Sequence, residues 1–206
     1  MLRALFWDMD DTLLLPRDPS PLRDFKLRYG LPLGELVLKG VQQRPPEERA
    51  LILEEFLSLE RRLSATSELR PGIQELLRSL KAQGYFLALI TNNHRASARI
   101  VLERHALHFD LLLTREDGDP KPSPDLLYKA LRLGGWRPEE VLYIGDSPHD
   151  GEAAQAAGIP CWFLATPFNE GLKPRFARVE DLAAALSADS ARASGGNSRE
   201  GPGTER

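Results

Sequence analysis

Two aspartates that follow a short apolar run near the amino terminus constrain this chain more than any other feature. Residues 4–7 are apolar, and Asp8 and Asp10 come directly after them, with Thr12 and two leucines following. A short apolar run that ends in polar residues is typical of a buried parallel strand whose carboxyl end opens into a loop. Ligands of open α/β sheets bind at that end. We therefore expect both carboxylates to project into a site.

Two carboxylates at this spacing repel each other, so one must take a proton or the two must share a cation. Mg²⁺ satisfies the second option, because it prefers oxygen ligands and is usually held by one or two carboxylates together with a substrate phosphate. An isolated pair of this kind is more often a solvated acidic turn. The magnesium interpretation therefore depends on the residues downstream.

Size and composition narrow the class of protein. The chain has 206 residues, which is room for one domain with a modest insertion. Its 27 basic and 30 acidic residues leave a formal charge of -3, which gives no indication of a nucleic-acid partner. No apolar run approaches the roughly 18 residues that span a bilayer, and Asp8 interrupts the apolar stretch that a signal peptide would need. We expect a soluble cytoplasmic protein, a monomer or homodimer, that binds neither nucleic acid nor a membrane.

The order of the predicted elements indicates an α/β fold. From residue 70 onward, apolar strand patterns alternate with helical patterns. Such alternation implies right-handed crossovers and a Rossmann-like parallel sheet with helices on both faces. The predicted strands are residues 4–7, 85–90, 111–113, 141–144 and 161–164.

Residues 16–69 contain no strand pattern and predict a small helical insertion. Ser20 and Pro21 can begin a helix that ends near Gly30, and a longer helix is predicted over residues 46–63. We expect residues 1–15 and 70–186 to form the core around this insertion. Residues 187–206 lack aromatic and large aliphatic side chains, so we predict that they are disordered.

Polar residues also follow later strands of the predicted sheet. Thr91 and Asn92 end the second strand, Asp146 and Asp150 follow the fourth, and Lys121 precedes a helix between these two strands. Any one of these polar residues alone is common in a surface loop and indicates no function. Because the carboxyl ends of parallel strands share one edge of the sheet, their joint placement predicts a single site.

In this order the segments resemble the four motifs of the haloacid dehalogenase-like hydrolase superfamily. The resemblance covers about residues 3–186 and is specific for the superfamily but not for the substrate. The double aspartate is typical of its phosphatase and phosphotransferase branches, although Asp11 stands where many relatives have glycine. The insertion, residues 16–69, resembles a small helical type 1 cap, as in phosphoglycolate phosphatases. The matching segments are Asp8-Met9-Asp10-Asp11-Thr12, Thr91-Asn92, Lys121 and Gly145-Asp146-Ser147-Pro148-His149-Asp150.

The resemblance implies a phosphatase that hydrolyses a small phosphate monoester through an aspartyl-phosphate intermediate. Asp8 is then the nucleophile, and Asp10 is the general acid and base. Thr91, the main-chain amide of Asn92 and Lys121 bind the phosphoryl oxygens, and Thr91 and Lys121 count among the catalytic residues.

The resemblance also implies a magnesium site. Asp8, the main-chain carbonyl of Asp10 and Asp146 hold the cation, and Asp150 is a further ligand, either direct or through water. The cation and the lysine then neutralise the phosphoryl oxygens so that a carboxylate can approach them.

Three alternatives remain open. A phosphomutase passes the phosphoryl group to a second hydroxyl instead of to water, and the sequence does not separate it from a phosphatase. A receiver-like phosphoacceptor domain also gathers aspartates, a threonine and a lysine around magnesium, but no acid ends the second strand here and such domains have no helical insertion. A scaffold that retains the motifs without activity is disfavoured by the complete set of acids.

Overall fold

The computed structural model describes residues 1–167 and 169–195, and a parallel sheet of six strands forms its centre. The strand order is β3-β2-β1-β4-β5-β6, and every neighbouring pair is parallel. The predicted α/β parallel sheet is confirmed. The two-residue strand β6 was not predicted, because two residues carry no periodic pattern. The strands are β1 (Ala4–Trp7), β2 (Phe86–Ile90), β3 (Leu111–Leu113), β4 (Val141–Gly145), β5 (Cys161–Leu164) and β6 (Arg175–Phe176).

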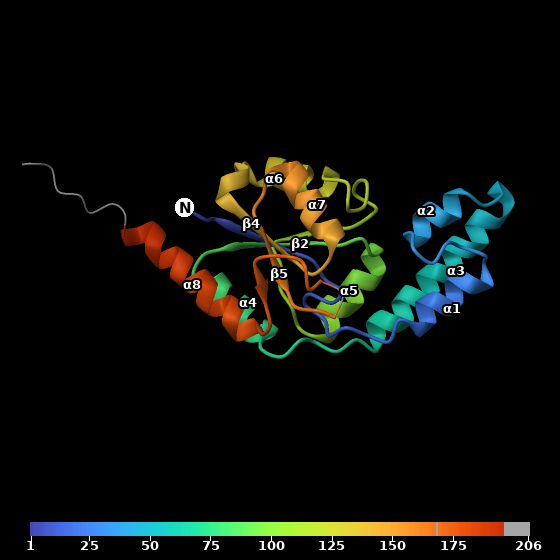
Figure 1. Ribbon diagram of the computed structural model, residues 1–206, viewed down its shortest axis with the longest axis horizontal. Helices are drawn as coiled ribbons and strands as arrows, with labels where there is room; N and C mark the ends of the chain where they lie inside the picture. The colour runs from blue at the N-terminus through green and yellow to red at the C-terminus, as the bar shows by residue number, and fades with distance from the viewer. Residues whose placement is uncertain (168, 196–206) are drawn as a thin grey trace, which may run out of the picture.

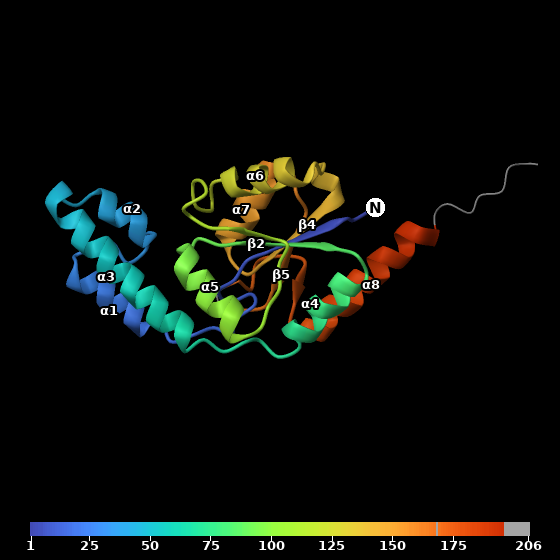
Figure 2. The same cartoon turned by 180° about the vertical axis from the view of Figure 1, so that it is seen from behind.

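Helices cover both faces of the sheet, which explains why its central strand is apolar throughout (Figures 1 and 2). Leu5 and Trp7 of β1 pack with residues of α4 (Ile73–Ala82), α5 (Arg95–Arg104) and α8 (Val179–Gly195). Ala4 and Phe6 point to the other face, where they pack with residues of α6 (Asp125–Gly134) and α7 (Pro148–Ala157). All four β1 side chains are fully buried, so this strand fixes the start of the loop that follows it. A short 3-10 helix, η1 (Pro138–Glu140), precedes β4.

Three helices of the predicted insertion lie beside the sheet, on the side away from α8 (Figure 1). They are α1 (Ser20–Arg28), α2 (Val37–Gln42) and α3 (Pro46–Ala65), and they enclose a small core of their own that includes Phe25 and Phe56. The two connections to the sheet pair with each other, since Leu15 N–H donates to the Glu68 carbonyl at 2.9 Å. The limits of the core and the insertion as separate folding units stay predictions.

The end of the chain differs from its prediction. Helix α8 continues to Gly195, so the prediction that disorder begins at residue 187 is wrong for residues 187–195. Leu182 and Leu186 are buried and belong to the same core cluster as α4, and a helix anchored in this way propagates easily through alanine, the best helix former. The composition of this segment predicts that it buries little surface, but it does not report the helix that precedes the segment. Residues 196–206 lie outside the described residues.

Within the described residues, no helix combines the length and the apolar character that a bilayer crossing requires. The cytoplasmic location and the monomeric or homodimeric state stay predictions.

Candidate active site

The loops after β1, β2 and β4 meet at one edge of the sheet. Strand β1 lies between β2 and β4, and Trp7 pairs in register with Leu89 and Ile144. Asp8 extends this pairing, because its N–H donates to the Ile144 carbonyl at 2.9 Å. Parallel strands in this register bring the residues that follow them together, as the sequence predicted for Asp8 and the polar ends of the other two strands.

Lys121 is the centre of the buried part of the site. Its Nζ lies 2.5 Å from Asp8 Oδ1, 2.6 Å from Asp150 Oδ1 and 2.7 Å from the Tyr143 hydroxyl. The lysine is only 2% exposed. Burial alone lowers the pKa of Lys121, but the carboxylates of Asp150 and Asp8 outweigh it and raise that pKa, so the ammonium stays charged.

Three carboxylates surround a position that a cation can occupy. Oxygen atoms of Asp8, Asp146 and Asp150 all lie within 4.8 Å of one another. Burial, together with repulsion from Asp150, raises the pKa of Asp8 to about 7 against the pull of Lys121. Burial and the nearby carboxylates, that of Asp8 first, raise the pKa of Asp146 to about 8. When all three are ionised, the cluster holds more negative charge than Lys121 balances, and an all-oxygen donor set of this kind fits Mg²⁺.

Asp150 is already saturated by protein donors. Its Oδ1 accepts from Lys121 and from the Tyr143 hydroxyl, and its Oδ2 accepts from the Asp146 N–H and from the N–H and hydroxyl of Ser147. A carboxylate offers about four lone-pair sites. Of the two ligand roles predicted for Asp150, this geometry favours the one through water, with the side chain orienting the loop and Lys121.

A glycine allows this arrangement. A Cβ added to Gly145, at the end of β4, would lie 2.6 Å from Asp150 Cγ, closer than real Cβ contacts allow. The Ser147 hydroxyl in turn accepts from the Asp150 N–H at 3.3 Å and caps α7. The Asp150 carboxylate therefore contacts the end of β4, the loop that follows it and the start of α7.

The residues after β2 contribute a contact that the sequence did not predict. The Asn92 side chain donates to the Lys121 carbonyl and accepts from the Lys121 N–H, both at 2.8 Å. The buried Thr91 hydroxyl accepts from the Asn93 N–H at 3.2 Å. Thr91 and Asn92 therefore follow the strand next to β1, and the Asn92 side chain also fixes the main chain that carries Lys121. Their role in phosphate binding stays a prediction.

The Asp10 carboxylate lies apart from the three that cluster. One of its oxygens accepts from Arg17 and the other from the Asn93 side chain. These contacts turn it toward a cavity of about 280 Å³ between α1, α3 and the loops after β1 and β2. The lining residues include Asp10, Asn93, Leu22, Phe56, Glu60 and Leu63.

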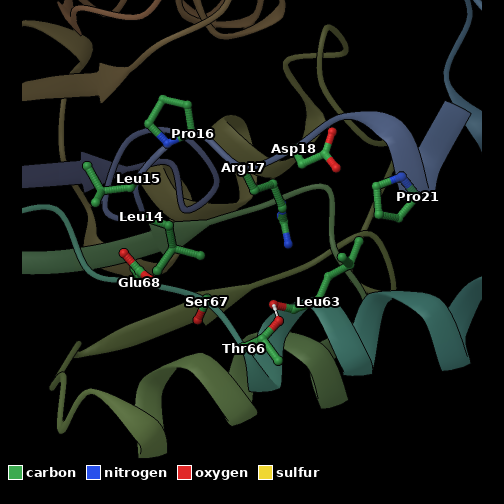
Figure 3. Close-up of a pocket in the computed structure, with 10 residues that line it drawn as sticks. All are labelled: Leu14, Leu15, Pro16, Arg17, Asp18, Pro21, Leu63, Thr66, Ser67 and Glu68. Carbon is green, nitrogen blue, oxygen red and sulfur yellow. Dashed lines mark hydrogen bonds between the residues drawn. The ribbon is translucent and has the colours of Figure 1, made fainter.

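A second cavity, of about 340 Å³, lies between the two connections that lead to and from the helical insertion. Arg17 lines both cavities, and Figure 3 shows its side chain extending from one connection toward the end of α3, where Leu63 and Thr66 lie. Arg17 therefore lies where the insertion, the sheet and Asp10 meet.

Comparison with known proteins assigns the family. The model of the haloacid dehalogenase-like hydrolase family matches residues 18–164. The chain belongs to this family. The resemblance predicted from the four motifs is thereby confirmed, although the matched range begins after Asp8 and Asp10.

Two of the relatives that this chain matches are named phosphoglycolate phosphatases. The protein from Nitrosospira multiformis is 30% identical over 198 residues, which cover 82% of this chain and 86% of the relative. Phosphoglycolate phosphatase 1 from Pseudomonas aeruginosa is 32% identical over 128 residues, 61% of this chain and 47% of the relative. For this relative and two others, the match spans about half of the relative's length. The structure of a hydrolase from Pseudomonas syringae has a TM-score of 0.73 at 21% identity, over 90% of this chain and 98% of that one, which supports the fold.

Two residues of this haloacid dehalogenase-like site were not assigned from the sequence. Tyr143 carries a hydroxyl in an otherwise apolar buried strand, and such a hydroxyl needs a partner, which is a signal that could have found it. Arg17 lies in a proline-rich connection and has no local signal that identifies its partner.

Proposed function

We propose that the protein is a magnesium-dependent phosphatase that hydrolyses a small phosphate monoester through an aspartyl phosphate on Asp8. The observation that carries the proposal is the placement of the Lys121 ammonium between Asp8 and Asp150, with Asp146 beside them. A buried carboxylate next to a fixed cation and a magnesium-compatible donor set is suited to attack on an anionic phosphoryl group.

Asp8, Asp146 and the main-chain carbonyl of Asp10 would hold Mg²⁺, which when bound supplies positive charge against the phosphoryl oxygens. Lys121 adds a second positive charge near the same oxygens. The Thr91 hydroxyl and the main-chain N–H of Asn92 bind the remaining phosphoryl oxygens. The Asn92 side chain keeps the lysine in place through its main chain.

The proposed reaction has two displacements. In the first, an Asp8 oxygen forms a bond to phosphorus, the ester P–O bond breaks, and Asp10 gives its proton to the departing alkoxide. In the second, Asp10 takes a proton from water as the water oxygen attacks phosphorus, the P–O bond to Asp8 breaks, and inorganic phosphate leaves. Asp8 and Asp10 then return to their starting protonation states.

The cavity beside Asp10 limits the leaving group. Its volume of about 280 Å³ lies at the small end of the range of about 300–1,000 Å³ usual for ligand pockets, which favours a small alcohol. Three relatives are named phosphoglycolate phosphatases, so phosphoglycolate is the first natural ester to test.

The test is turnover of p-nitrophenyl phosphate by the purified protein with Mg²⁺ and with EDTA. We expect many turnovers per chain with Mg²⁺ and loss of activity in EDTA. Phosphorylation that stops at one phosphate per chain would instead identify a receiver-like phosphoacceptor and overturn the proposal. A screen of phosphoglycolate, sugar phosphates and nucleoside monophosphates then separates a phosphatase, which releases inorganic phosphate, from a phosphomutase, which does not.

A further inference from the structure

A buried ion pair joins the helical insertion to the sheet. Glu60 lies on α3 and Arg115 follows β3, and the two side chains are 7% and 9% exposed. Both terminal nitrogens of Arg115 donate to Glu60, one to each carboxylate oxygen, the second at 2.7 Å. The guanidinium carbon also lies 5.2 Å from the centre of the Phe56 ring, which belongs to the same helix.

The same arginine contacts the second motif. Its Nη1 donates to the Asn92 carbonyl at 3.2 Å. The Asn92 side chain makes two hydrogen bonds to the Lys121 main chain, and Lys121 Nζ contacts Asp8. A continuous series of polar contacts therefore leads from Glu60 on the insertion to the proposed nucleophile.

The chemistry of the pair suits positioning better than stability. Removing two charges from water costs about as much as their attraction returns, so a buried ion pair is weak evidence of stabilisation. A bidentate contact between arginine and a carboxylate, however, fixes the distance between the two side chains and their relative orientation. Among the ion pairs of the described residues, this is the one that joins α1, α2 or α3 to the chain after residue 70.

Glu60 also lines the cavity of about 280 Å³ that Asp10 faces. The pair therefore forms only when α3 covers the side of the site where the leaving group would lie. If α3 moves away, Arg115 loses its two acceptors on Glu60, and its contact with the Asn92 carbonyl is no longer held in place.

We propose that Glu60 and Arg115 are a positioning pair that couples the docking of α3 to the placement of Lys121. The proposal deepens the proposed phosphatase function and rests on it. Closure of the cavity and alignment of the lysine then occur together, so the phosphoryl group meets a complete site only when the insertion is docked.

The test compares Glu60→Gln, Arg115→Gln and the double variant by kcat and KM for p-nitrophenyl phosphate with Mg²⁺. We expect each single variant to lower kcat about 10-fold with less than about a 3-fold change in KM, because Lys121 acts mainly on the transition state. We expect the double variant to be no worse than the poorer single variant, as for two residues that act as one unit. Multiplied losses would overturn the proposal.

Each variant is normalised to its folded fraction, measured by circular dichroism. A purely structural role lowers the folded fraction and the melting temperature but leaves kcat per folded chain unchanged, and that result would also overturn the proposal. Arg115→Lys replaces Arg115→Gln if the latter does not fold, and we expect it to lose kcat because one ammonium cannot make the two-pronged contact.

The matched control is Glu55→Gln, which breaks the exposed pair of Glu55 with Arg28 inside the insertion. It should leave kcat and KM unchanged. Absence of activity in the wild-type protein would refute the proposed function itself, whereas an active wild type with equally active Glu60 and Arg115 variants would refute only the positioning pair.

Discussion

Lys121 Nζ and Asp8 Oδ1 lie 2.5 Å apart, although 113 positions separate the two residues in the chain. Both side chains are buried, and Asp150 shares the same ammonium. One lysine thus faces two carboxylates directly and a third, Asp146, close by. Without a cation, three carboxylates face one ammonium, and the first three predictions follow from this excess of acidic groups.

Lys121→Met should destabilise the protein in EDTA at pH 7. The substitution leaves Asp8 and Asp150 buried without their cation, and removal of one partner of a buried ion pair costs about 3–5 kcal/mol. Urea denaturation measures the free energy of unfolding. Lys129→Met is the control, because Lys129 and Asp117 form a half-exposed pair at 3.6 Å whose loss should cost less than about 1 kcal/mol. Equal losses in the two variants would contradict the role given to Lys121.

Asp8→Asn should remove turnover without unfolding the protein. The amide is similar in shape but cannot form the acyl phosphate, so we expect the turnover of p-nitrophenyl phosphate to fall by at least about 1,000-fold. The melting temperature in EDTA should not fall at pH 8, since a buried anion with a raised pKa is replaced by a neutral group. Asp24→Asn, at an exposed position on α1, is the matched control. Hydrolysis that persists in Asp8→Asn rules Asp8 out as the nucleophile.

The stability of the metal-free protein should decrease as the pH rises from about 4 toward 8. Burial and neighbouring carboxylates raise the pKa of Asp8 to about 7 and that of Asp146 to about 8, against 3.8 for a free aspartate. Between pH 3.8 and the raised pKa of each group, Asp8 and Asp146 keep their protons in the folded state, whereas in the unfolded state they have released them. Each such proton costs about 1.4 kcal/mol of stability per pH unit.

Calorimetry at several pH values, in EDTA and in Mg²⁺, measures this effect. Mg²⁺ should raise the melting temperature more at pH 8 than at pH 5, because it binds the ionised carboxylates. Asp150 contributes in the opposite sense, since burial raises its pKa but Lys121 outweighs burial and lowers it, so its contribution is present above pH 4. Asp146→Asn removes one of the two carboxylates with a raised pKa, so in EDTA the melting temperature of this variant should fall less steeply as the pH rises. A magnesium effect of the same size at both pH values would count against the three-carboxylate site.

The strands and their polar ends could be predicted because their signals are local. Residues 4–7 and 141–144 are apolar on both faces and end in acids, and parallel pairing fixes which residues meet at the edge. Lys121 was different, because a lysine in a loop carries no such signal, and only the resemblance to the family's motifs assigned its role.

The contacts that complete the site could not be predicted in the same way. The sequence places Asn92 at the end of a strand, but it does not show that the Asn92 side chain donates to the main-chain carbonyl of Lys121, 29 residues further on. Arg115 and Glu60 are 55 residues apart and lie in different layers of the molecule. The partner of a polar side chain depends on packing between elements, which periodicity does not contain. Helix α8 shows the same limit, since its extent depends on its packing beside α4.

Asp10→Asn tests the proton transfers. Arg17 and Asn93 hold the two Asp10 oxygens at the edge of the cavity, so the amide can occupy the same place but can neither give a proton to an alkoxide nor take one from water. General acid or base catalysis contributes about 100-fold to 10,000-fold. We expect phosphorylation by alkyl phosphates to slow by at least about 100-fold. Phosphorylation by p-nitrophenyl phosphate should slow far less, because nitrophenolate leaves without a proton.

Because water attack on the aspartyl phosphate also needs the base, Asp10→Asn should give a rapid burst of nitrophenolate followed by slow steady-state turnover, measured by quenched flow. The control is Asp18→Asn, at a residue that lines the same cavity but whose carboxylate accepts from the Ser20 N–H at 2.9 Å. It should show no burst. If Asp10→Asn changes KM alone, with both chemical steps at the wild-type rate, then Asp10 binds the substrate and another group moves the proton.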